Sequence, residues 1–425
     1  MENVLVEARE RDSRDDLRAF RDAFWIPAGP DGRDQAYFCG HSLGLQPRAA
    51  TEKLATEMKR WRELAVGGHF LGQPAWIDYG DDLAEMMARL VGARTEEVTV
   101  MNTLTVNLHL LMVSFYRPAG RRRKILIEHG AFPSDRYAVA SQIRFHGLDP
   151  EECLVAFEPQ PGARLIEESD LENWLLERGD EVALVLWPGV QYASGQAFDL
   201  ARISAAGRAA GARVGFDLAH SVGNQPLSLH ETGCDFAAWC TYKYLNGGPG
   251  SVAGCFVHAR HAEDASLPRF EGWWGNERSG RFRMEAGFAP AAGAEAWQIS
   301  NPPILAMAPL RASLSIHLEA GPERLRAKSR SMTGWLAQNI ETRLGDALEI
   351  MTPADPERRG CQLSLRVRAG RAEGRRLFEH LQSHGVIVDW REPDILRVAP
   401  APLYNRYEDC CQFVEQAAAW ARGVN

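Results

Sequence analysis

The chain has 425 residues, of which 45% are hydrophobic and 24% are charged, and its formal net charge is −8. This composition is typical of a globular protein with room for one large and one small domain. It favours neither nucleic acid nor an anionic membrane as a partner, and no stretch approaches the roughly 18 apolar residues of a membrane-spanning helix. The acidic N-terminus is unlike a signal peptide, and the eight cysteines have no disulfide-framework spacing, so we expect a cytoplasmic location.

The first quarter of the chain predicts helices separated by one tight loop. Residues 1–25 have the spacing of a short amphipathic helix, which usually packs as an arm. Residues 37–47 contain two glycines and a terminal proline, so they form either a plain connection or a turn that faces a substrate. Helices are expected over residues 48–65 and 79–91.

Residues 98–105 turn from a strand into a helix that we expect over residues 106–116. Thr103 or Thr105 can serve as the N-cap of this helix. A helix N-terminus offers unpaired N–H groups and the positive end of the dipole, so it suits a phosphate. Simple capping explains the same residues equally well.

Strands and helices then alternate, which predicts an α/β fold with parallel strands and right-handed crossovers. Buried strands are expected over residues 125–128, 182–187, 213–217 and 236–239, and an antiparallel or edge strand over 252–258. From about residue 311 the pattern is that of a compact α+β domain. We therefore expect an N-terminal arm (1–47) that joins the small domain, a large domain (48–310) and a small C-terminal domain (311–425).

Four chemically useful side chains follow two of these strands. Asp217 and His220 close one apolar run, and Tyr242 and Lys243 follow the next. Function in α/β sheets gathers at the carboxyl ends of strands, so these groups should converge on one edge. A lysine can form a Schiff base there, and an acid beside it suits the pyridinium nitrogen of pyridoxal phosphate (PLP).

No metal site is assigned from the sequence. His258 and His261 have a possible ligand spacing, but no third ligand lies close to them in sequence. The glycine-rich stretch 247–254 matches neither a dinucleotide-binding motif nor a P-loop.

With these residues laid out, the chain resembles the kynureninase family. The matching stretches run in order through nearly the whole chain: 38–47, 102–112, 131–135, 216–220, 242–246, 299–305, 359–363 and 397–405. The resemblance implies an aspartate aminotransferase-like large domain with a mostly parallel seven-stranded sheet and a small α+β domain. It also implies PLP as cofactor, a homodimer, and hydrolytic cleavage of L-kynurenine and 3-hydroxy-L-kynurenine to anthranilate or 3-hydroxyanthranilate and L-alanine.

The resemblance also implies the cofactor site. Lys243 would hold PLP covalently and move protons, Asp217 would bind the ring nitrogen, Phe132 would stack on the ring, and Tyr242 would be a second catalytic group. The cofactor-binding residues carried over are Leu104, Thr105, Phe132, Pro133, Ser134, Asp135, Asp217, His220, Tyr242, Lys243, Trp273 and Asn301.

The substrate residues carried over are Ser42, His69, Asn301 and Arg397, with Arg397 on the α-carboxylate. His69, Ser300 and Asn301 are similar to the trio of relatives that prefer 3-hydroxykynurenine. Three positions depart from the family pattern. His41 stands where Asn is common, Pro188 stands where some relatives have Ser, and Trp273 or Trp274 can correspond to the single tryptophan of relatives.

Two other functions stay open at this point. A cysteine desulfurase or an aminotransferase would share the fold, and a desulfurase would need a mobile nucleophilic cysteine such as Cys361. A non-catalytic binding protein of this fold would have no need to keep Lys243, Asp217 and Arg397 together.

Overall fold

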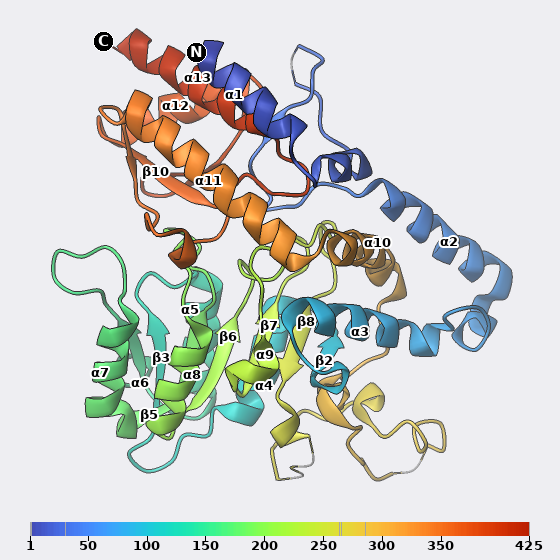
Figure 1. Cartoon of the computed structure of the whole chain (residues 1–425). Helices are drawn as coiled ribbons and strands as arrows, with labels where there is room; N and C mark the ends of the chain where they lie inside the picture. Colours follow the sequence, from blue (N-terminus) through green and yellow to red (C-terminus); the bar gives the residue numbers. More distant parts are fainter. Residues whose placement is uncertain (1, 30, 263, 265, 285, 425) are drawn as a thin grey trace.

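The computed structural model describes residues 2–29, 31–262, 264, 266–284 and 286–424 (Figure 1). A seven-stranded sheet forms the centre of the larger part, in the order β2-β8-β7-β6-β5-β3-β4. Its strands are β2 (Val98–Val100), β3 (Lys124–Glu128), β4 (Leu154–Phe157), β5 (Val182–Pro188), β6 (Arg213–Asp217), β7 (Phe236–Trp239) and β8 (Gly254–Val257). Neighbours from β4 to β7 pair in parallel, and β8 is antiparallel to both β7 and β2. The predicted mostly parallel α/β sheet is confirmed.

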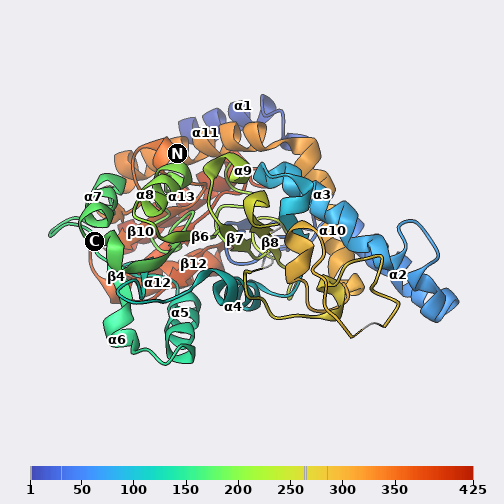
Figure 2. The same ribbon diagram turned by 90° about the horizontal axis from the view of Figure 1, so that it is seen from below.

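Successive apolar residues of these strands enter two different cores. Ile125 and Ile127 of β3 belong to one core, whereas Leu126 between them belongs to the other. Helices therefore cover both faces, as Figure 2 shows. One face carries α4 (Leu104–Phe115), α5 (Pro133–Phe145) and α6 (Pro150–Cys153), and the other carries α3 (Tyr79–Val91), α7 (Glu168–Arg178), α8 (Leu200–Ala209), α9 (Leu229–Thr232) and α10 (Ile304–Ala320).

The C-terminal part is built on a four-stranded antiparallel sheet in the order β12-β13-β10-β9. Its strands are β9 (Leu348–Ile350), β10 (Leu363–Val367), β12 (Asp389–Arg391) and β13 (Ile395–Val398), and its helices are α11 (Pro322–Leu344), α12 (Arg371–Ser383) and α13 (Tyr407–Val424). The N-terminal α1 (Glu2–Ser13) packs into the same core through Val4 and Ala8. A short parallel pair, β1 (Ala36–Tyr37) with β11 (Val386–Ile387), also joins the N-terminal segment to this part.

The division of the chain at residue 310 stays a prediction. It falls inside α10, whose Met307, Leu310 and Leu314 all pack in the core of the large sheet. The long helix α2 (Arg48–Leu64) lies against α10 and extends away from the body of the molecule. All eight cysteines are buried and free. Within the described ranges, no helix is both long enough and apolar enough to cross a membrane.

Candidate active site

The carboxyl ends of the parallel strands enclose a cavity of 230 Å³. Glu128 ends β3, Pro188 ends β5, Asp217 ends β6, and Lys243 follows β7 after a short turn. The cavity is lined by predicted cofactor residues from α4, from α5 and the loop before it, and from the carboxyl ends of β6 and β7: Leu104, Thr105, Phe132, Ser134, Asp135, Asp217, His220, Tyr242 and Lys243. The convergence predicted for Asp217, His220, Tyr242 and Lys243 is confirmed.

Two helix N-termini meet at one end of this cavity. Thr103 occupies the N-cap position of α4, but its side chain makes no capping bond, so the first N–H groups of α4 lack that partner. Thr105 in the first turn of α4 lies with its Oγ1 2.8 Å from Oγ of Ser134 in the first turn of α5. Two positive helix ends with two hydroxyls fit a phosphate.

Three carboxyl groups line another part of the cavity: Glu128 and Asp217 are buried, and Asp135 is partly buried. Burial raises the pKa of Glu128 well above its ordinary value, and the negative charge of Asp217 raises it further. Burial and the neighbouring Asp217 likewise raise the pKa of Asp135, whose carboxyl hydrogen-bonds Asp217. Asp217 also accepts the N–H of Ala219 at 2.7 Å. Such a cluster holds protons or a cation, and it fits a pyridinium N–H.

Aromatic side chains and the lysine line the same cavity. Lys243 Nζ lies 5.9 Å from the centre of the Phe132 ring, and Phe132 meets Tyr192 edge-on at 5.2 Å. Burial, followed by the charge of Lys243, lowers the pKa of His220 well below its ordinary value. Burial raises the pKa of Tyr242, so its phenol keeps its proton at neutral pH. Together with the two helix N-termini and the three carboxyl groups, these side chains fit PLP.

The loop over residues 37–47 packs directly on the lysine segment. Gly44 donates its N–H to the Tyr242 carbonyl at 2.8 Å, and a Cβ on Gly44 would stand 2.3 Å from the Lys243 carbonyl oxygen. The loop therefore belongs to the surroundings of the site and is not a plain connection.

The small domain contributes a group of charged residues beside the cavity. Arg397 is 1% exposed, donates from Nη1 to the carbonyl of Tyr192 at 2.9 Å, and lies with Nη2 2.8 Å from Oδ2 of Asp389. Arg391 also pairs with Asp389 and donates to Ser42 Oγ at 3.4 Å. Because Tyr192 lines the cavity, Arg397 lies at its border.

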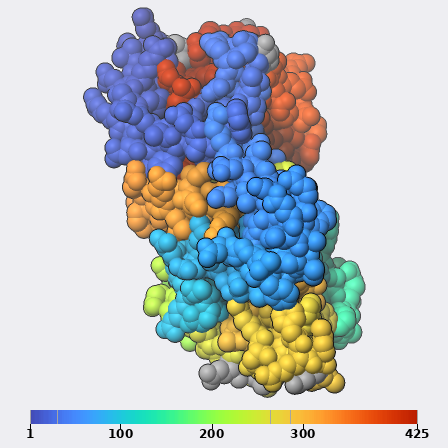
Figure 3. Space-filling model, turned by 90° about the vertical axis from the view of Figure 1, so that its right-hand side faces the viewer, coloured from blue at the N-terminus to red at the C-terminus, as the bar shows by residue number. Residues whose placement is uncertain are grey.

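This cavity is not lined by the predicted residues Ser42, His69, Pro133, Trp273, Ser300, Asn301 and Arg397. His69 packs edge-on against Trp76 at 5.5 Å, Trp273 is 46% exposed, and Asn301 is exposed. His69 and Trp273 belong to one surface, because their neighbours Phe70 and Phe282 lie 6.0 Å apart and Trp273 lies 5.4 Å from Phe282. Figure 3 shows this surface, where the segment after α2 meets the segment around residue 280. Trp274, by contrast, is buried under Arg281. Pro133 begins α5 behind the cavity wall.

Sequence reasoning missed several of the residues that line or border the cavity. Glu128 and Tyr192 line it, and Asp389 holds Arg397 at its border. The position of Glu128 as the last residue of a buried strand was an available signal, as for Asp217. Asp389 had no comparable signal, because it reaches the site only through the pairing of β12 with β13.

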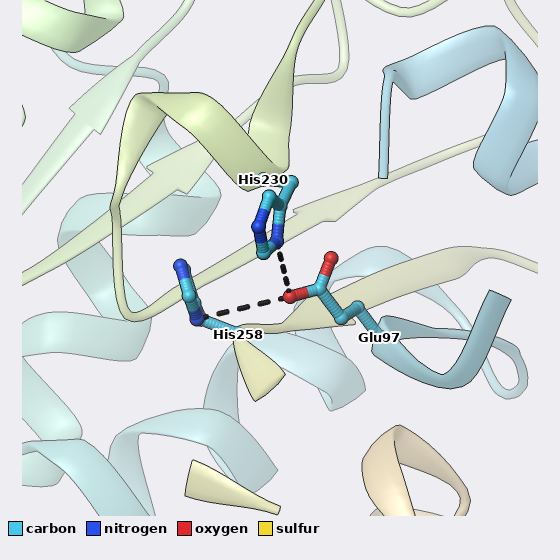
Figure 4. Close-up of side chains that lie close together, drawn as sticks. All are labelled: Glu97, His230 and His258. Atoms are coloured by element: carbon cyan, nitrogen blue, oxygen red, sulfur yellow. Dashed lines mark hydrogen bonds and ion pairs between the residues drawn. The ribbon is translucent and has the colours of Figure 1, made fainter. Parts of the chain in front are cut away.

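A second set of buried ionisable residues lies at the opposite edge of the large sheet (Figure 4). Glu97 precedes β2 and is fully buried, and its Oε1 lies 2.8 Å from His230 Nδ1 and 3.7 Å from His258 Nδ1. These three residues have the composition of a metal site. Their polar atoms already have protein partners, however, since Ala259 N–H donates to Glu97 at 2.8 Å and Arg260 N–H donates to His258 at 3.2 Å.

A family model described as the kynureninase C-terminal domain matches residues 325–417. The chain is 58% identical over 410 residues to a kynureninase of Stenotrophomonas maltophilia (strain K279a), covering 96% of each chain. It is 57% identical over 416 residues to a kynureninase of Xanthomonas axonopodis pv. citri (strain 306), covering 98% of each.

Solved structures with the same fold are more distant in sequence. A C-DES mutant with glycine covalently linked to the PLP cofactor has a TM-score of 0.77 at 18% identity, covering 94% of this chain and 98% of that chain. The cysteine desulfurase CsdA from Escherichia coli has a TM-score of 0.75 at 17% identity, covering 96% and 98%. These likenesses support the fold alone.

Proposed function

The chain belongs to the kynureninase family, and from this premise we propose how its site acts. The reaction is hydrolytic cleavage of the Cβ–Cγ bond of L-kynurenine to anthranilate and L-alanine. The observation that carries the assignment to the cavity is that Lys243, Asp217 and two helix N-termini meet there, in a chain 58% identical to a kynureninase. Bound PLP supplies an electron sink for the amino acid's Cα.

Residues of the chain are proposed to bind the cofactor and to move the protons. The N-terminal turns of α4 and α5, with Thr105 and Ser134, would bind the phosphate. Asp217 Oδ would accept the ring N–H, and Asp135, whose pKa is raised, keeps a proton and hydrogen-bonds Asp217. Lys243 Nζ would hold the cofactor, and as a free amine it can accept the α-proton of the substrate.

Two further residues act on the substrate side. Arg397 binds the α-carboxylate, for which a planar guanidinium is well shaped. Tyr242 keeps its phenol proton because burial raises its pKa, and it donates that proton to the three-carbon fragment after cleavage.

A direct test uses purified holoenzyme and L-kynurenine, with anthranilate followed by fluorescence and alanine by amino-acid analysis. Lys243→Ala should lower kcat by about 10³-fold or more, because it removes both the anchor and the base. It should also remove the visible absorbance of lysine-bound cofactor. Lys124→Ala, which removes a lysine paired with Glu181 far from the cavity, should leave kcat unchanged. Full activity of Lys243→Ala would refute the assignment.

We also propose that 3-hydroxykynurenine is a good substrate and that the aromatic end is read by His69, Ser300 and Asn301. A site that hydrogen-bonds a ring hydroxyl discriminates strongly on that group. His69→Trp should therefore change the ratio of kcat/KM for the two kynurenines by at least about tenfold. An unchanged ratio would remove His69 from the specificity site.

A homodimer would bring His69, Trp273 and Asn301 to a cavity that they do not line within one chain. The exposed aromatic side chains beside them, which include Trp61, Phe70 and Phe282, favour burial against a second copy. Mixing Lys243→Ala with Asn301→Ala subunits, followed by dissociation and reassembly, should restore part of the activity. Equal inactivity of the mixture and of each parent would contradict a shared site.

The competing activity on this fold is less well supported. Burial raises the pKa of the Cys361 thiol to about 12, and Cys361 is fully buried, so it is neither mobile nor a thiolate. Release of sulfide from L-cysteine in place of alanine from L-kynurenine would revive the desulfurase hypothesis. With its free cysteines, the chain also suits the reducing cytoplasm that we propose as its location.

A further inference from the structure

His41 is a fully buried side chain beside the active site, and its ring nitrogens make no well-oriented hydrogen bond among the described residues. Few buried polar groups in folded proteins lack a partner, so an unpaired imidazole calls for an explanation. The loop that carries it cannot easily turn outward, because Gly40 lies against the Tyr404 hydroxyl and Gly44 bonds the Tyr242 carbonyl.

His41 lies between the two halves of the site. Its Nε2 is 3.9 Å from Oδ2 of Asp389, which belongs to the small domain. On its other side its ring centre is 6.2 Å from that of His220, which lines the cavity and whose Nδ1 also lacks a partner in the described chain. Polar atoms of the small domain and of the cavity wall therefore lie on both sides of His41.

The charges in this place do not balance. One carboxylate, Asp389, faces two guanidinium groups: Nε of Arg391 lies 3.0 Å from Oδ1 and Nη2 of Arg397 lies 2.8 Å from Oδ2. Despite that short distance, Nη2 of Arg397 makes no well-oriented hydrogen bond within the described residues. A cluster with an excess of positive charge, in which the buried Arg397 has an unused N–H group, suits a small anion such as a carboxylate.

His41 is neutral in these surroundings. Burial lowers its pKa well below the ordinary value, and the positive charges of Arg397, Lys243 and Arg391 lower it further. A contact of the ring with the Phe38 backbone opposes this lowering of the pKa and is outweighed. A neutral imidazole carries one N–H donor and one acceptor nitrogen. Its N–H can therefore donate to an anion without adding another positive charge to the cluster.

We propose that His41 is a substrate-binding residue that donates its imidazole N–H to the α-carboxylate held by Arg397. The inference rests on the proposed function in one respect, namely that Arg397 binds the α-carboxylate. Asp389 holds Arg397 in place and faces His41 before the substrate arrives. Because the proposed contact is with the α-carboxylate, loss of the His41 N–H should weaken the binding of ligands that carry a carboxylate. It should leave the binding of other ligands unchanged.

Two variants of similar shape test the proposal in the holoenzyme. His41→Asn keeps an N–H donor, whereas His41→Leu has the same branched shape without one. Each is titrated with L-alanine, the carboxylate-bearing product, and with kynuramine, the substrate without its carboxylate, by the visible absorbance of the bound cofactor. His41→Ala replaces the leucine variant if the latter does not fold.

The leucine variant should bind L-alanine about 10- to 100-fold more weakly than the wild type, the usual cost of losing a hydrogen bond to a charged group. The asparagine variant should stay within about threefold, and kynuramine should bind all three proteins equally. Equal behaviour of the two variants, or equal losses for both ligands, would overturn the proposal. Failure of the wild type to cleave L-kynurenine would instead count against the proposed function, because these titrations do not depend on turnover.

Discussion

The two edges of the large sheet treat buried ionisable groups in opposite ways. At the amino-terminal edge, Glu97 accepts hydrogen bonds from two backbone N–H groups and His230, and Asp235 is held by His261, Arg260 and the N–H of Val214. At the carboxyl edge, by contrast, carboxyl groups crowd one another and His41 and His220 keep unpaired nitrogens. Burial alone therefore does not mark the functional site.

The two edges also differ in how their buried ionisable groups affect the stability of the fold. Burial alone would raise the pKa of Asp235, but its hydrogen bonds with His261, Val214 and Arg260 outweigh burial and hold that pKa below its ordinary value. Burial dominates for Glu128 and raises its pKa. The first kind of group stabilises the fold at neutral pH, and the second kind costs stability there. This loss of stability is tolerated at an active site, because the cofactor and the substrate supply the partners that these groups lack within the protein.

The largest expected change in stability follows from Glu97→Ala. The substitution leaves two partly buried N–H groups and His230 without their acceptor, so the free energy of unfolding should fall by about 2–4 kcal/mol. Urea unfolding measures this, with Glu96→Ala, an exposed neighbour, as the control. A loss below about 1 kcal/mol would mean that this edge is not a structural network.

The pH dependence of this edge has a definite sign. Burial would raise the pKa of Glu97, but hydrogen bonds from Arg94, Ala259 and His230 hold it below the ordinary value. Its contribution is therefore present above the unfolded pKa, near 4.5, and is lost as the pH falls through the lowered folded pKa.

Glu128→Gln should have a smaller effect of the opposite sign. Because the folded pKa of Glu128 is raised, its ionisation costs stability as the pH rises from the unfolded value toward the folded one. A neutral amide removes that cost, so the apoenzyme should gain about 1 kcal/mol at pH 8 and less at pH 5. Urea midpoints of the apoenzyme at both pH values measure it. A loss of stability that is equal at both pH values would contradict this assignment.

The smallest effect is expected for His258→Gln. Burial, followed by the charge of Arg260, lowers the pKa of His258 to about 4, so the ring is neutral at working pH. The substitution should change the unfolding free energy by less than about 1 kcal/mol at pH 7. Micromolar Zn²⁺ should shift the melting temperature of the variant and of the wild type equally. A zinc-dependent stabilisation of the wild type alone would show that Glu97, His230 and His258 form a metal site.

The sequence was sufficient to predict those features of the fold and of the site that depend on strand periodicity and chain order. Asp217 and Lys243 follow apolar runs, so their meeting at one sheet edge could be predicted, as could the helices at 48–64 and 79–91. Long-range pairings could not be predicted in this way. Glu97 and His230 lie 133 residues apart, and Asp389 reaches Arg397 only through strand pairing.

The placement of loops is another part that local patterns do not contain. Motifs selected His69, Trp273 and Asn301, but none of them lines the cavity that Lys243 and Asp217 line. Trp273 and Asn301 are exposed in the single chain.

The comparison is tested most directly by making one substitution, Asp to Asn, at each edge and measuring both kcat/KM for L-kynurenine and the free energy of unfolding. Asp217→Asn should lower kcat/KM by about 10²-fold or more with little loss of stability, because it removes the partner of the cofactor's ring nitrogen. Asp235→Asn should lower stability by about 2–4 kcal/mol and leave kcat/KM of the folded enzyme unchanged. If both substitutions lowered activity and stability alike, the distinction between the two edges would be wrong.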